Sequence, residues 1–348
     1  MTIEEGEGLL LNKPMSQKPV KIAVIGVGHL GRYHALKLAS LPEAELVGVV
    51  DIDAERAQKV AQECQTKAFT NFREILPRVE AVSVVVPTIH HYEVASEALR
   101  AGCHVFVEKP LAASPKEAKA LVKMAKDLGL ILQVGHIERF NPAIKRLLAE
   151  VEKPLLVEAQ RFSQFSPRCL DVDVILDLMI HDIDLLLLLI KSPVVELQAA
   201  GAPVITNKTD MASVRLTFKN GVVANLTASR IAMKPIRRFR VFQKGSYLAA
   251  DTLEGTFLKV DFKGEGHLPP EEFEPYVERF QKADPLLEEL ATFVQVIKNR
   301  GQPPVSGQEG FSALELAFKI KREIERQKAY FLAREGNCLQ ELTRHSVF

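Results

Sequence analysis

From residue 20 to residue 136, the chain alternates short apolar runs with segments in which apolar residues recur every three or four positions. The short runs are rich in valine, isoleucine, leucine and alanine, and they occupy 21–26, 44–53, 81–88, 104–110 and 130–136. The segments with helical periodicity lie at 31–42, 54–65, 91–102 and 114–129. Buried strands separated by helices predict a parallel sheet with helices on both faces, which is an α/β, doubly wound (Rossmann) fold.

The pattern changes after residue 150. Residues 155–165 and 237–262 alternate as strands do, and 213–229 predicts a hairpin around Asn220-Gly221, the strongest two-residue turn signal. A long apolar segment over 172–190 predicts a helix, and helical periodicity returns at 285–299 and 310–327. The second half is therefore predicted to be an α+β domain.

These patterns divide the 348 residues into four parts. We expect a disordered N-terminal extension over 1–19, a Rossmann domain over 20–137, an α+β domain over 138–330 and a C-terminal tail over 331–348. Met15 stands just ahead of the first strand. Residues 1–14 are therefore either a disordered extension or the result of a mis-assigned start codon.

Composition and charge exclude several classes of protein. The 45 lysines and arginines balance 44 aspartates and glutamates, and this near-neutral charge disfavours nucleic acid as a partner. The longest apolar run, 185–190, is far too short to span a membrane, and the N-terminus lacks the features of a signal peptide. The four cysteines form no Cys-x-x-Cys pair, so we expect no metal site, free thiols and a cytoplasmic location.

Three glycines follow the first predicted strand and open the first predicted helix. Gly26, Gly28 and Gly31 form the pattern G-x-G-x-x-G, with His29 and Leu30 inside it. The first glycine permits a tight turn, the second lets a pyrophosphate approach the backbone, and the third lets helix and strand pack closely. The start of the helix supplies unpaired N–H groups and a positive dipole end. These five residues are therefore candidates for binding a dinucleotide.

An acidic residue stands where such a site needs one. Asp51 ends the second predicted strand, 20 residues after Gly31, which is the spacing expected for a carboxylate that binds ribose hydroxyls. Because this carboxylate would repel a 2′-phosphate, NAD is favoured over NADP. Arg56, one helical turn later, keeps NADP open. The other interpretation is an ordinary α/β turn with an incidental acidic residue.

Two further motifs resemble the Gfo/Idh/MocA family of sugar oxidoreductases. The first is a strand that ends in Pro-Thr with a histidine three residues beyond, followed by Ala-Gly-Cys-His-Val at 101–105. The second is Glu-Lys-Pro at 108–110, and the resemblance extends over roughly 20–325. It implies an NAD(P)-dependent oxidoreductase acting on CH–OH groups, with cofactor contacts from Pro87, Thr88, His91, Glu108 and Lys109.

The resemblance also implies a catalytic role for Lys109. A lysine at the carboxyl end of a parallel strand can hydrogen-bond both a ribose and a substrate hydroxyl, and can stabilise a developing alkoxide. The alternative is a solvated surface lysine.

The segment DLMIHDID matches the family's D-x-x-x-H pattern through Asp177 and His181. These residues are i and i+4 on a helix and share a face. The resemblance implies that His181 is the general base and that Asp177 orients the substrate or the imidazole. A core histidine or a metal pair are the alternatives, and we expect Asp182 and Asp184 to be solvated or capping. Many family members have glycines just before this helix; DVDVIL stands here instead, which leaves the depth of Asp177 open.

The segment GHIERFNPA at 135–143, taken with DLMIHDIDLLLLL, resembles the branch of the family that oxidises C3 of UDP-N-acetylglucosamine. In that branch an aminotransferase converts the 3-keto product, which supplies lipid A precursors in Gram-negative bacteria. The alternatives are the branch that oxidises the corresponding UDP-uronic acid for O-antigen sugars, and oxidation of inositol or a free sugar. An NAD-binding protein that has lost catalysis is a further alternative.

Substrate contacts and assembly are expected from the second half. Arg139, Asn141 and Arg161 are candidates, with His181, for binding the nucleotide sugar, because arginine presents paired donors to a diphosphate. The alternative for each arginine is to brace the domain crossing. The resemblance implies an open mixed β-sheet, one face of which closes the active site while the other forms a subunit interface. We therefore expect a homodimer or homotetramer.

Overall fold

The computed structural model describes residues 18–166, 172–262, 275–280 and 283–344, with side chains as far as residue 328 in the last helix. The predictions for 1–14 lie outside the described residues, as does nearly all of the predicted extension over 1–19. The side chains of the predicted tail over 331–348 lie outside them too. Cys64 and Cys103 are free thiols. None of the helices in the described ranges has an apolar stretch of the length that a membrane crossing requires.

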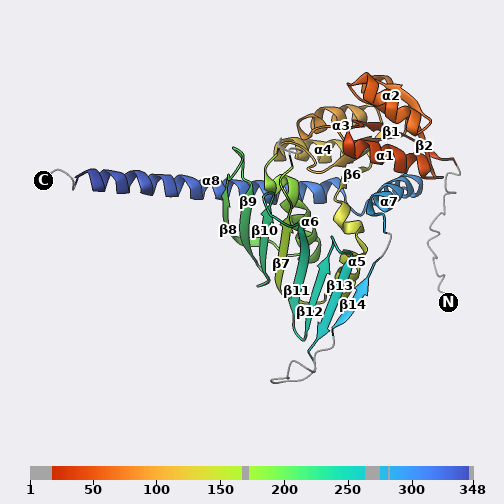
Figure 1. Cartoon of the computed structure of the whole chain (residues 1–348). Coiled ribbons are helices and arrows are strands. Elements are labelled where there is room, and N and C mark those ends of the chain that lie inside the picture. The colour runs from red at the N-terminus through yellow and green to blue at the C-terminus, as the bar shows by residue number, and fades with distance from the viewer. Residues whose placement is uncertain (1–17, 167–171, 263–274, 281–282, 345–348) are drawn as a thin grey trace, which may run out of the picture.

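Six parallel strands form the sheet of the N-terminal domain (Figure 1). Their order, β3-β2-β1-β4-β5-β6, puts the first strand in the middle with a crossover on each side, as in dinucleotide-binding sheets. The sequence pattern missed β3, which has only three residues. The strands are β1 (Val20–Ile25), β2 (Ala44–Val50), β3 (Lys67–Phe69), β4 (Ala81–Val84), β5 (His104–Glu108) and β6 (Leu132–Gly135).

Helices cover this sheet, and side-chain caps explain where several of them begin and end. The side chains of Asp53 and Ser114 accept hydrogen bonds from backbone N–H groups at the starts of α2 and α4, and Gly129 ends α4 with a φ of 65°. All four predicted helices are confirmed. They are α1 (His29–Ser40), α2 (Ala54–Glu63), α3 (His91–Arg100) and α4 (Pro115–Leu128), with 3₁₀ segments η1 (Phe72–Glu74), η2 (Leu76–Arg78), η3 (Thr88–His90) and η4 (Ile137–Phe140).

The second domain is built on an eight-stranded sheet of order β14-β13-β12-β11-β7-β10-β9-β8. Strands β7 and β10 pair in parallel and the other neighbours pair antiparallel, so the predicted mixed sheet is confirmed. The strands are β7 (Pro154–Phe162), β8 (Val194–Ala202), β9 (Met211–Phe218), β10 (Val223–Ser229), β11 (Ile236–Gln243), β12 (Ser246–Asp251), β13 (Thr256–Asp261) and β14 (Tyr276–Arg279).

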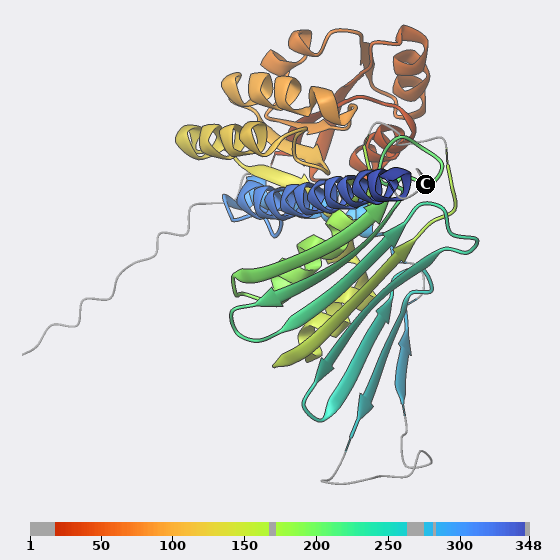
Figure 2. The same ribbon diagram turned by 90° about the vertical axis from the view of Figure 1, so that its left-hand side faces the viewer.

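Helices pack on one face of this second sheet, and the other face is turned away from them (Figure 2). The packed elements are α5 (Pro142–Glu150), the π-helix η5 (Ile175–Met179) and α6 (Ile180–Leu189). The single α-helix predicted over 172–190 is therefore wrong in its first part. A π-helical turn is rare and often marks a functional site.

The hairpin between β9 and β10 differs from the prediction by one residue. The N–H of Gly221 donates to the Phe218 carbonyl at 2.9 Å, so Lys219 and Asn220 form the centre of the turn. Only Gly221 has a positive φ, of 87°, whereas a two-residue turn centred on Asn220-Gly221 would need both residues there. The connection is a three-residue loop that ends on the glycine.

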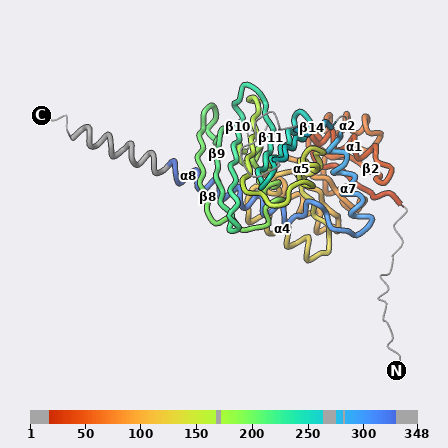
Figure 3. The backbone as a smooth tube through the Cα atoms, turned by 90° about the horizontal axis from the view of Figure 1, so that it is seen from below, coloured from red at the N-terminus to blue at the C-terminus, as the bar shows by residue number. Residues whose placement is uncertain are grey.

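The chain returns to the first domain at its end. Helix α7 (Pro285–Asn299) has the predicted bounds, and its Leu290 and Phe293 pack with Ile22 and Phe106 of the Rossmann sheet. Helix α8 (Gly307–Arg344) is longer at both ends than the predicted 310–327, and it lies against α4, α6 and β8. The predicted range 138–330 thus contains a helix that packs on the first domain. Figure 3 shows α7 beside the Rossmann elements and β8 at the opposite side of the molecule.

Candidate active site

The three glycines of the first turn meet different surroundings. A Cβ on Gly26 would lie 2.6 Å from the Val85 carbonyl oxygen, and a Cβ on Gly31 would lie 1.8 Å from the Gly26 oxygen. Both positions are therefore closed by backbone. A Cβ on Gly28 would meet nothing within 4 Å, so the middle position is open to a ligand. This is the arrangement that a pyrophosphate needs.

The start of α1 offers the donors for that ligand. Gly28 caps α1 without a side-chain hydrogen bond, and the first turn contains no acidic residue. His29 and Leu30 are exposed in this turn. Uncapped N–H groups and the positive end of the helix dipole favour an anion here. The loop therefore fits the diphosphate of NAD.

Asp51 lies at the end of β2 and connects it to the glycine turn. Its Oδ2 accepts from the N–H of Val27 at 3.0 Å, and its Oδ1 accepts from the N–H of Asp53 at 3.0 Å and from Arg56 Nη1 at 2.9 Å. Oδ2 accepts a single hydrogen bond in this arrangement, so it has a lone pair for a ribose hydroxyl. Arg56, the residue that kept NADP open, also pairs with Asp53 at 2.9 Å.

His91 connects the ends of β4 and β5. Its ring is buried, with Nδ1 2.8 Å from the Pro110 carbonyl oxygen and Nε2 2.9 Å from the Val86 carbonyl oxygen. Thr88 is buried and Pro87 is exposed at the start of η3. The imidazole therefore holds the turn that follows Lys109. The peptide bond between Lys109 and Pro110 in this turn is cis. Pro87 forms the exposed end of the loop that follows β4.

Lys109 contacts the second domain. Its Nζ donates to the Asp177 carbonyl oxygen at 2.7 Å and to the Asp177 Oδ1 at 3.2 Å. Lys109 follows the carboxyl end of β5, and Asp177 lies in η5. Their side chains remain 18% and 19% exposed. An ammonium and a carboxylate from two domains therefore meet at a place that a substrate can reach.

His181 lies one turn beyond Asp177, in the first turn of α6. Its Nδ1 is buried and has no hydrogen-bond partner among the described residues, although the side chain as a whole is partly exposed. Burial, followed by the charges of Lys109 and Arg161, holds the pKa of His181 well below its usual value. The ring is therefore neutral at neutral pH and can accept a proton.

His136 is a residue that the sequence reasoning missed. It follows β6, is buried, and its ring lies perpendicular to that of His181 with 6.2 Å between the centroids. Burial lowers the pKa of His136 as well. This histidine stands in the motif GHIERFNPA, from which the sequence predicts contacts only by Arg139 and Asn141. His181 thus has a second neutral imidazole as its neighbour.

Glu108 stabilises the turn that carries Lys109. Its Oε2 accepts from the N–H of Lys109 at 3.2 Å, and its Oε1 lies 3.1 Å from Nε2 of the buried His34. Burial raises the pKa of Glu108, but the hydrogen bond and charge of His34 and the charge of Lys109 outweigh it, so the net shift is downward. A Cβ on Gly135 would lie 2.8 Å from Oε1, which explains the glycine at the end of β6.

Arg139 has its donors occupied by the protein. Nε and Nη2 donate to the two carboxylate oxygens of Asp184 at 2.7 and 2.6 Å, and Nη1 donates to the Pro304 carbonyl and to Glu309 Oε1, both at 2.7 Å. This buried guanidinium joins η4, α6 and the start of α8. The geometry favours the bracing alternative over a substrate contact.

Arg161 is placed in the same way. It donates to Asp182 Oδ1 from Nη2 at 2.8 Å and to Glu138 Oε1 from Nη1 at 2.6 Å, and all three side chains are buried. The expectation that Asp182 and Asp184 are solvated or capping is wrong, because each is buried against an arginine. The carboxylates are needed there because an unpaired buried guanidinium is costly.

Asn141 begins α5. Its Oδ1 accepts from the N–H of Ala143 at 3.0 Å, and its Nδ2 lies 3.5 Å from the Thr252 carbonyl oxygen. Both contacts are structural, so the geometry gives the side chain a capping role.

A cavity of about 980 Å³ lies elsewhere, against the amino ends of β1, β5 and β6. Val20, His104 and Leu132 line it. Ligands of open α/β sheets bind at the carboxyl ends of the strands, where Gly28, Asp51 and Lys109 lie. Cavity size therefore does not locate the candidate site.

The glycine turn, Asp51 and the Lys109–Asp177–His181 group together define an NAD-binding dehydrogenase. Comparison with known proteins agrees. Residues 20–136 match the profile of an oxidoreductase family with an NAD-binding Rossmann fold, and residues 154–247 match the GFO/IDH/MocA C-terminal domain. The chain belongs to the Gfo/Idh/MocA family, and it is an NAD-dependent oxidoreductase acting on CH–OH groups.

Relatives extend over almost the whole chain. UDP-N-acetylglucosamine 3-dehydrogenase of Acidithiobacillus ferrooxidans is 41% identical over 309 residues, which are 88% of this chain and 97% of that protein. Its crystal structure matches with a TM-score of 0.81 at 40% identity, over 88% of this chain and 98% of that one. Myo-inositol 2-dehydrogenase of Thermotoga maritima is 29% identical over 89% of this chain and 98% of its own length.

A more distant structure has the same fold. Scyllo-inositol dehydrogenase of Lactobacillus casei, solved with NAD(H) and scyllo-inositol, matches with a TM-score of 0.75 at 19% identity, over 89% of this chain and 98% of that one.

Proposed function

We propose that this protein oxidises the C3 hydroxyl of UDP-N-acetylglucosamine to the 3-keto sugar with NAD. The observation that carries the proposal is the meeting of Lys109 from the Rossmann domain with Asp177 and His181 from the second domain. The likeness to the Acidithiobacillus enzyme, at 41% identity over 97% of its length, supports this choice of sugar and carbon.

Each residue has a role in this reaction. When bound, NAD supplies the hydride acceptor. His181, neutral because it is buried beside cations, takes the hydroxyl proton, and the ammonium of Lys109 stabilises the oxygen as negative charge develops on it. Asp177 accepts from Lys109 and so fixes the direction of the ammonium. Gly28 and the first turn of α1 hold the diphosphate of NAD, and Asp51 holds its ribose.

A different arginine is available for the substrate diphosphate. Arg237 on β11 is exposed and has no ion pair or side-chain hydrogen bond among the described residues. It lies opposite Arg161 in the register of β11 and β7, and its charge contributes to the low pKa of His181. An exposed guanidinium this near the base suits an anionic group of the substrate. We assign it this role in the proposal.

The experiment is an assay of NADH formation by the purified protein with NAD and a panel of sugars. We expect turnover with UDP-N-acetylglucosamine and little with myo-inositol or with the corresponding UDP-uronic acid. Reduction of the product with borodeuteride, followed by NMR, should locate deuterium at C3. Arg237→Gln should raise the KM for the nucleotide sugar about tenfold and leave NAD affinity unchanged. Turnover of myo-inositol alone would overturn the choice of substrate.

Finer parts of the proposal concern the setting of the enzyme. A 3-keto sugar is a substrate for an aminotransferase, and we place this step in lipid A biosynthesis in the cytoplasm. We also propose a homodimer or homotetramer, for which the uncovered face of the second sheet offers a surface (Figure 2). A coupled assay with an added aminotransferase and sedimentation of the purified protein would check these two points.

A further inference from the structure

Asp177 and His181 lie on one continuous helical segment whose first residues contain no glycine. It begins at 172–174 and continues as the π-helix η5 and then as α6. A π turn is wider than an α turn, so the place of Asp177 relative to Lys109 depends on how the first residues are held. Contacts from three sides hold them.

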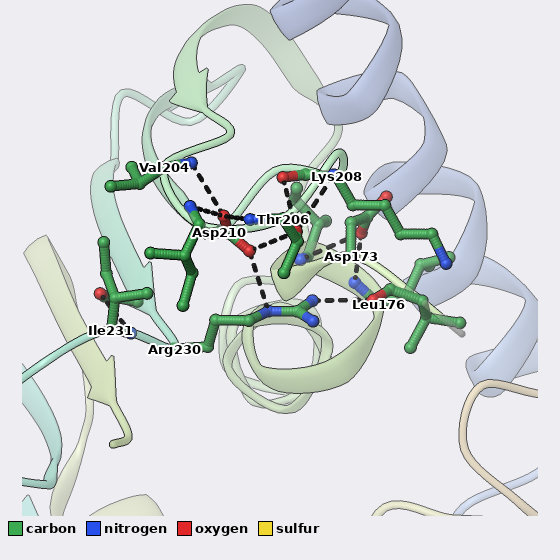
Figure 4. Close-up of polar contacts among 12 residues, drawn as sticks. Asp173, Leu176, Val204, Thr206, Lys208, Asp210, Arg230 and Ile231 are labelled. Atoms are coloured by element: carbon green, nitrogen blue, oxygen red, sulfur yellow. Dashed lines mark hydrogen bonds and ion pairs between the residues drawn. The ribbon is translucent and has the colours of Figure 1, made fainter. Parts of the chain in front are cut away.

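Asp173 caps the π-helix. Its Oδ1 accepts from the N–H of Ile175 and from the N–H of Leu176, both at 3.1 Å, and its carbonyl oxygen accepts from the N–H of Asp177 at 3.0 Å. The side chain is buried, with 8% of the residue exposed. One residue therefore fixes three amides of the turn, including that of Asp177 itself. Figure 4 shows Asp173 beside Leu176.

Helix α8 holds Asp173 from outside. Lys321 Nζ lies 2.7 Å from Asp173 Oδ2, the carboxylate oxygen that does not accept from the amides of the π-helix. The ammonium also lies 4.8 Å from the centre of the Phe318 ring on the same helix, which keeps its side chain along the helix surface. Asp173, at the start of the segment that contains η5 and α6, is thus bound to a helix that also packs on the Rossmann domain through α4.

A buried aspartate shapes the loop on the other side (Figure 4). Asp210 Oδ2 accepts from the N–H groups of Val204, Ile205 and Thr206 at 2.8, 2.8 and 2.9 Å, and its Oδ1 accepts from the Thr206 hydroxyl at 2.7 Å. Burial raises the pKa of Asp210, but these hydrogen bonds outweigh it and lower the pKa to about 2. The carboxylate therefore stays ionised and holds the backbone of residues 204–206 in place.

The loop that Asp210 shapes contacts residues 172–174, which precede η5. The Thr209 carbonyl accepts from the N–H of Val174 at 3.0 Å, and Arg230 Nη2 donates to the Val172 carbonyl at 2.8 Å. Arg230 Nε lies 3.8 Å from Asp210 Oδ1, so the same aspartate orients the arginine. Residues 172–174 are therefore held by Arg230, which follows β10, and by the loop before β9, as well as by α8.

We propose that Asp173 is a positioning residue for the reaction, which sets the place of Asp177 and His181 relative to Lys109 and is itself held by Lys321. The proposal deepens the proposed function and rests on it. Asp173 acts only through the backbone of the π-helix.

The test compares Asp173→Ala, Asp173→Asn and Lys321→Met with the control Lys319→Met. Lys319 lies two residues away on α8, is exposed, and pairs with Glu315 at 3.1 Å. We expect Asp173→Ala to lower kcat about ten- to a hundredfold, because a displacement near 1 Å at reacting groups costs that much. Asp173→Asn keeps an acceptor for the two amides and should recover part of the rate. Lys321→Met should lower kcat several-fold, and Lys319→Met should not change it.

Two measurements need no sugar and separate positioning from general damage. Hydrogen exchange of amides 175–177 should be faster in the Asp173→Ala and Lys321→Met proteins, while the affinity for NAD stays at the wild-type value. Normal kcat and normal exchange in Asp173→Ala would overturn the proposal, as would equal behaviour of Lys321→Met and Lys319→Met. If Asp173→Ala does not fold, the lysine pair still decides. A wild-type protein without turnover of UDP-N-acetylglucosamine would contradict the proposed function instead, and the exchange data would still test Asp173.

Discussion

Asp177, Asp182 and Asp184 lie on one short stretch of chain, and each pairs with a cation from elsewhere in the sequence. The Lys109–Asp177 pair forms one group, the two arginine–aspartate pairs form the other, and the groups differ in burial. Lys109 and Asp177 are 18% and 19% exposed, whereas Arg139 and Asp184 are 6% and 2% exposed, and Arg161 and Asp182 are 6% and 4% exposed. In the first group a polar edge remains open to a substrate. In the second group the guanidinium donors are bonded to carboxylates and a carbonyl.

The comparison teaches how similar charges come to serve different purposes. A group that acts on a substrate must have a donor or lone pair that the protein does not use, and it must be reachable. A buried ion pair has neither property, and it holds elements together at a high desolvation cost. Lys109 and His181 are therefore expected to control rate, and Arg139 and Arg161 to control stability.

The largest effect is expected for the proposed catalytic residues. Lys109→Met and His181→Ala should each lower kcat about a thousandfold, because in the proposed reaction each removes a group that acts on the hydroxyl as it loses its proton. Steady-state assays of NADH formation would measure the change, and unfolding by urea should show near wild-type stability. The matched control is Lys123→Met, which removes the exposed Lys123–Asp127 pair on α4. Near-normal turnover in either variant would refute the assignment.

The buried pairs should show the opposite result. Arg161→Met leaves Asp182 and Glu138 buried without their cation, which should lower the free energy of unfolding by about 3–5 kcal/mol. Arg238→Met removes an ion pair to Asp251 whose arginine is 53% exposed, and it should change stability by about 1 kcal/mol or less. Equilibrium unfolding in urea compares the two. If Arg161→Met folds with normal stability and a raised KM, the arginine is a substrate contact after all.

The glycine turn extends the comparison between open and closed positions. Gly28→Ala places a methyl group where no atom lies within 4 Å, so the thermal midpoint should stay the same while the affinity for NAD falls about tenfold or more. Gly31→Ala places its Cβ 1.8 Å from the Gly26 oxygen, so it should lower the thermal midpoint itself. Calorimetry and NAD titration separate these outcomes. Equal NAD affinity in Gly28→Ala would remove the assigned diphosphate site.

The smallest effect concerns the pH profile. A base works only when unprotonated, so turnover falls as the pH drops through the pKa of His181. Because burial and nearby cations lower this pKa, the acid limb of kcat/KM should lie well below the usual value of 6.5. Arg237→Gln removes one of these cations and should move the limb slightly upward, whereas Arg238→Met should not move it. A limb at or above 6.5 in the wild-type protein would contradict the role of His181.

Much of the fold followed from local patterns. Patterns of neighbouring residues predict the Rossmann strands and helices, the bounds of α7 and the glycine turn, because backbone periodicity and turn chemistry act over a few positions. Local reasoning failed where the surroundings decide. It missed the three residues of β3, extended an α-helix over the π turn of η5, and ended α8 too early.

The class of fold, the dinucleotide turn and the residue types of the candidate site follow from patterns along the chain. Which charges meet follows only from how the two domains pack. Lys109 and Asp177 are 68 positions apart and Arg139 and Glu309 are 170 apart, so no local spacing connects them. The physical reason is that burial and distance, which depend on the packing of both domains, decide whether a charged side chain serves chemistry or stability.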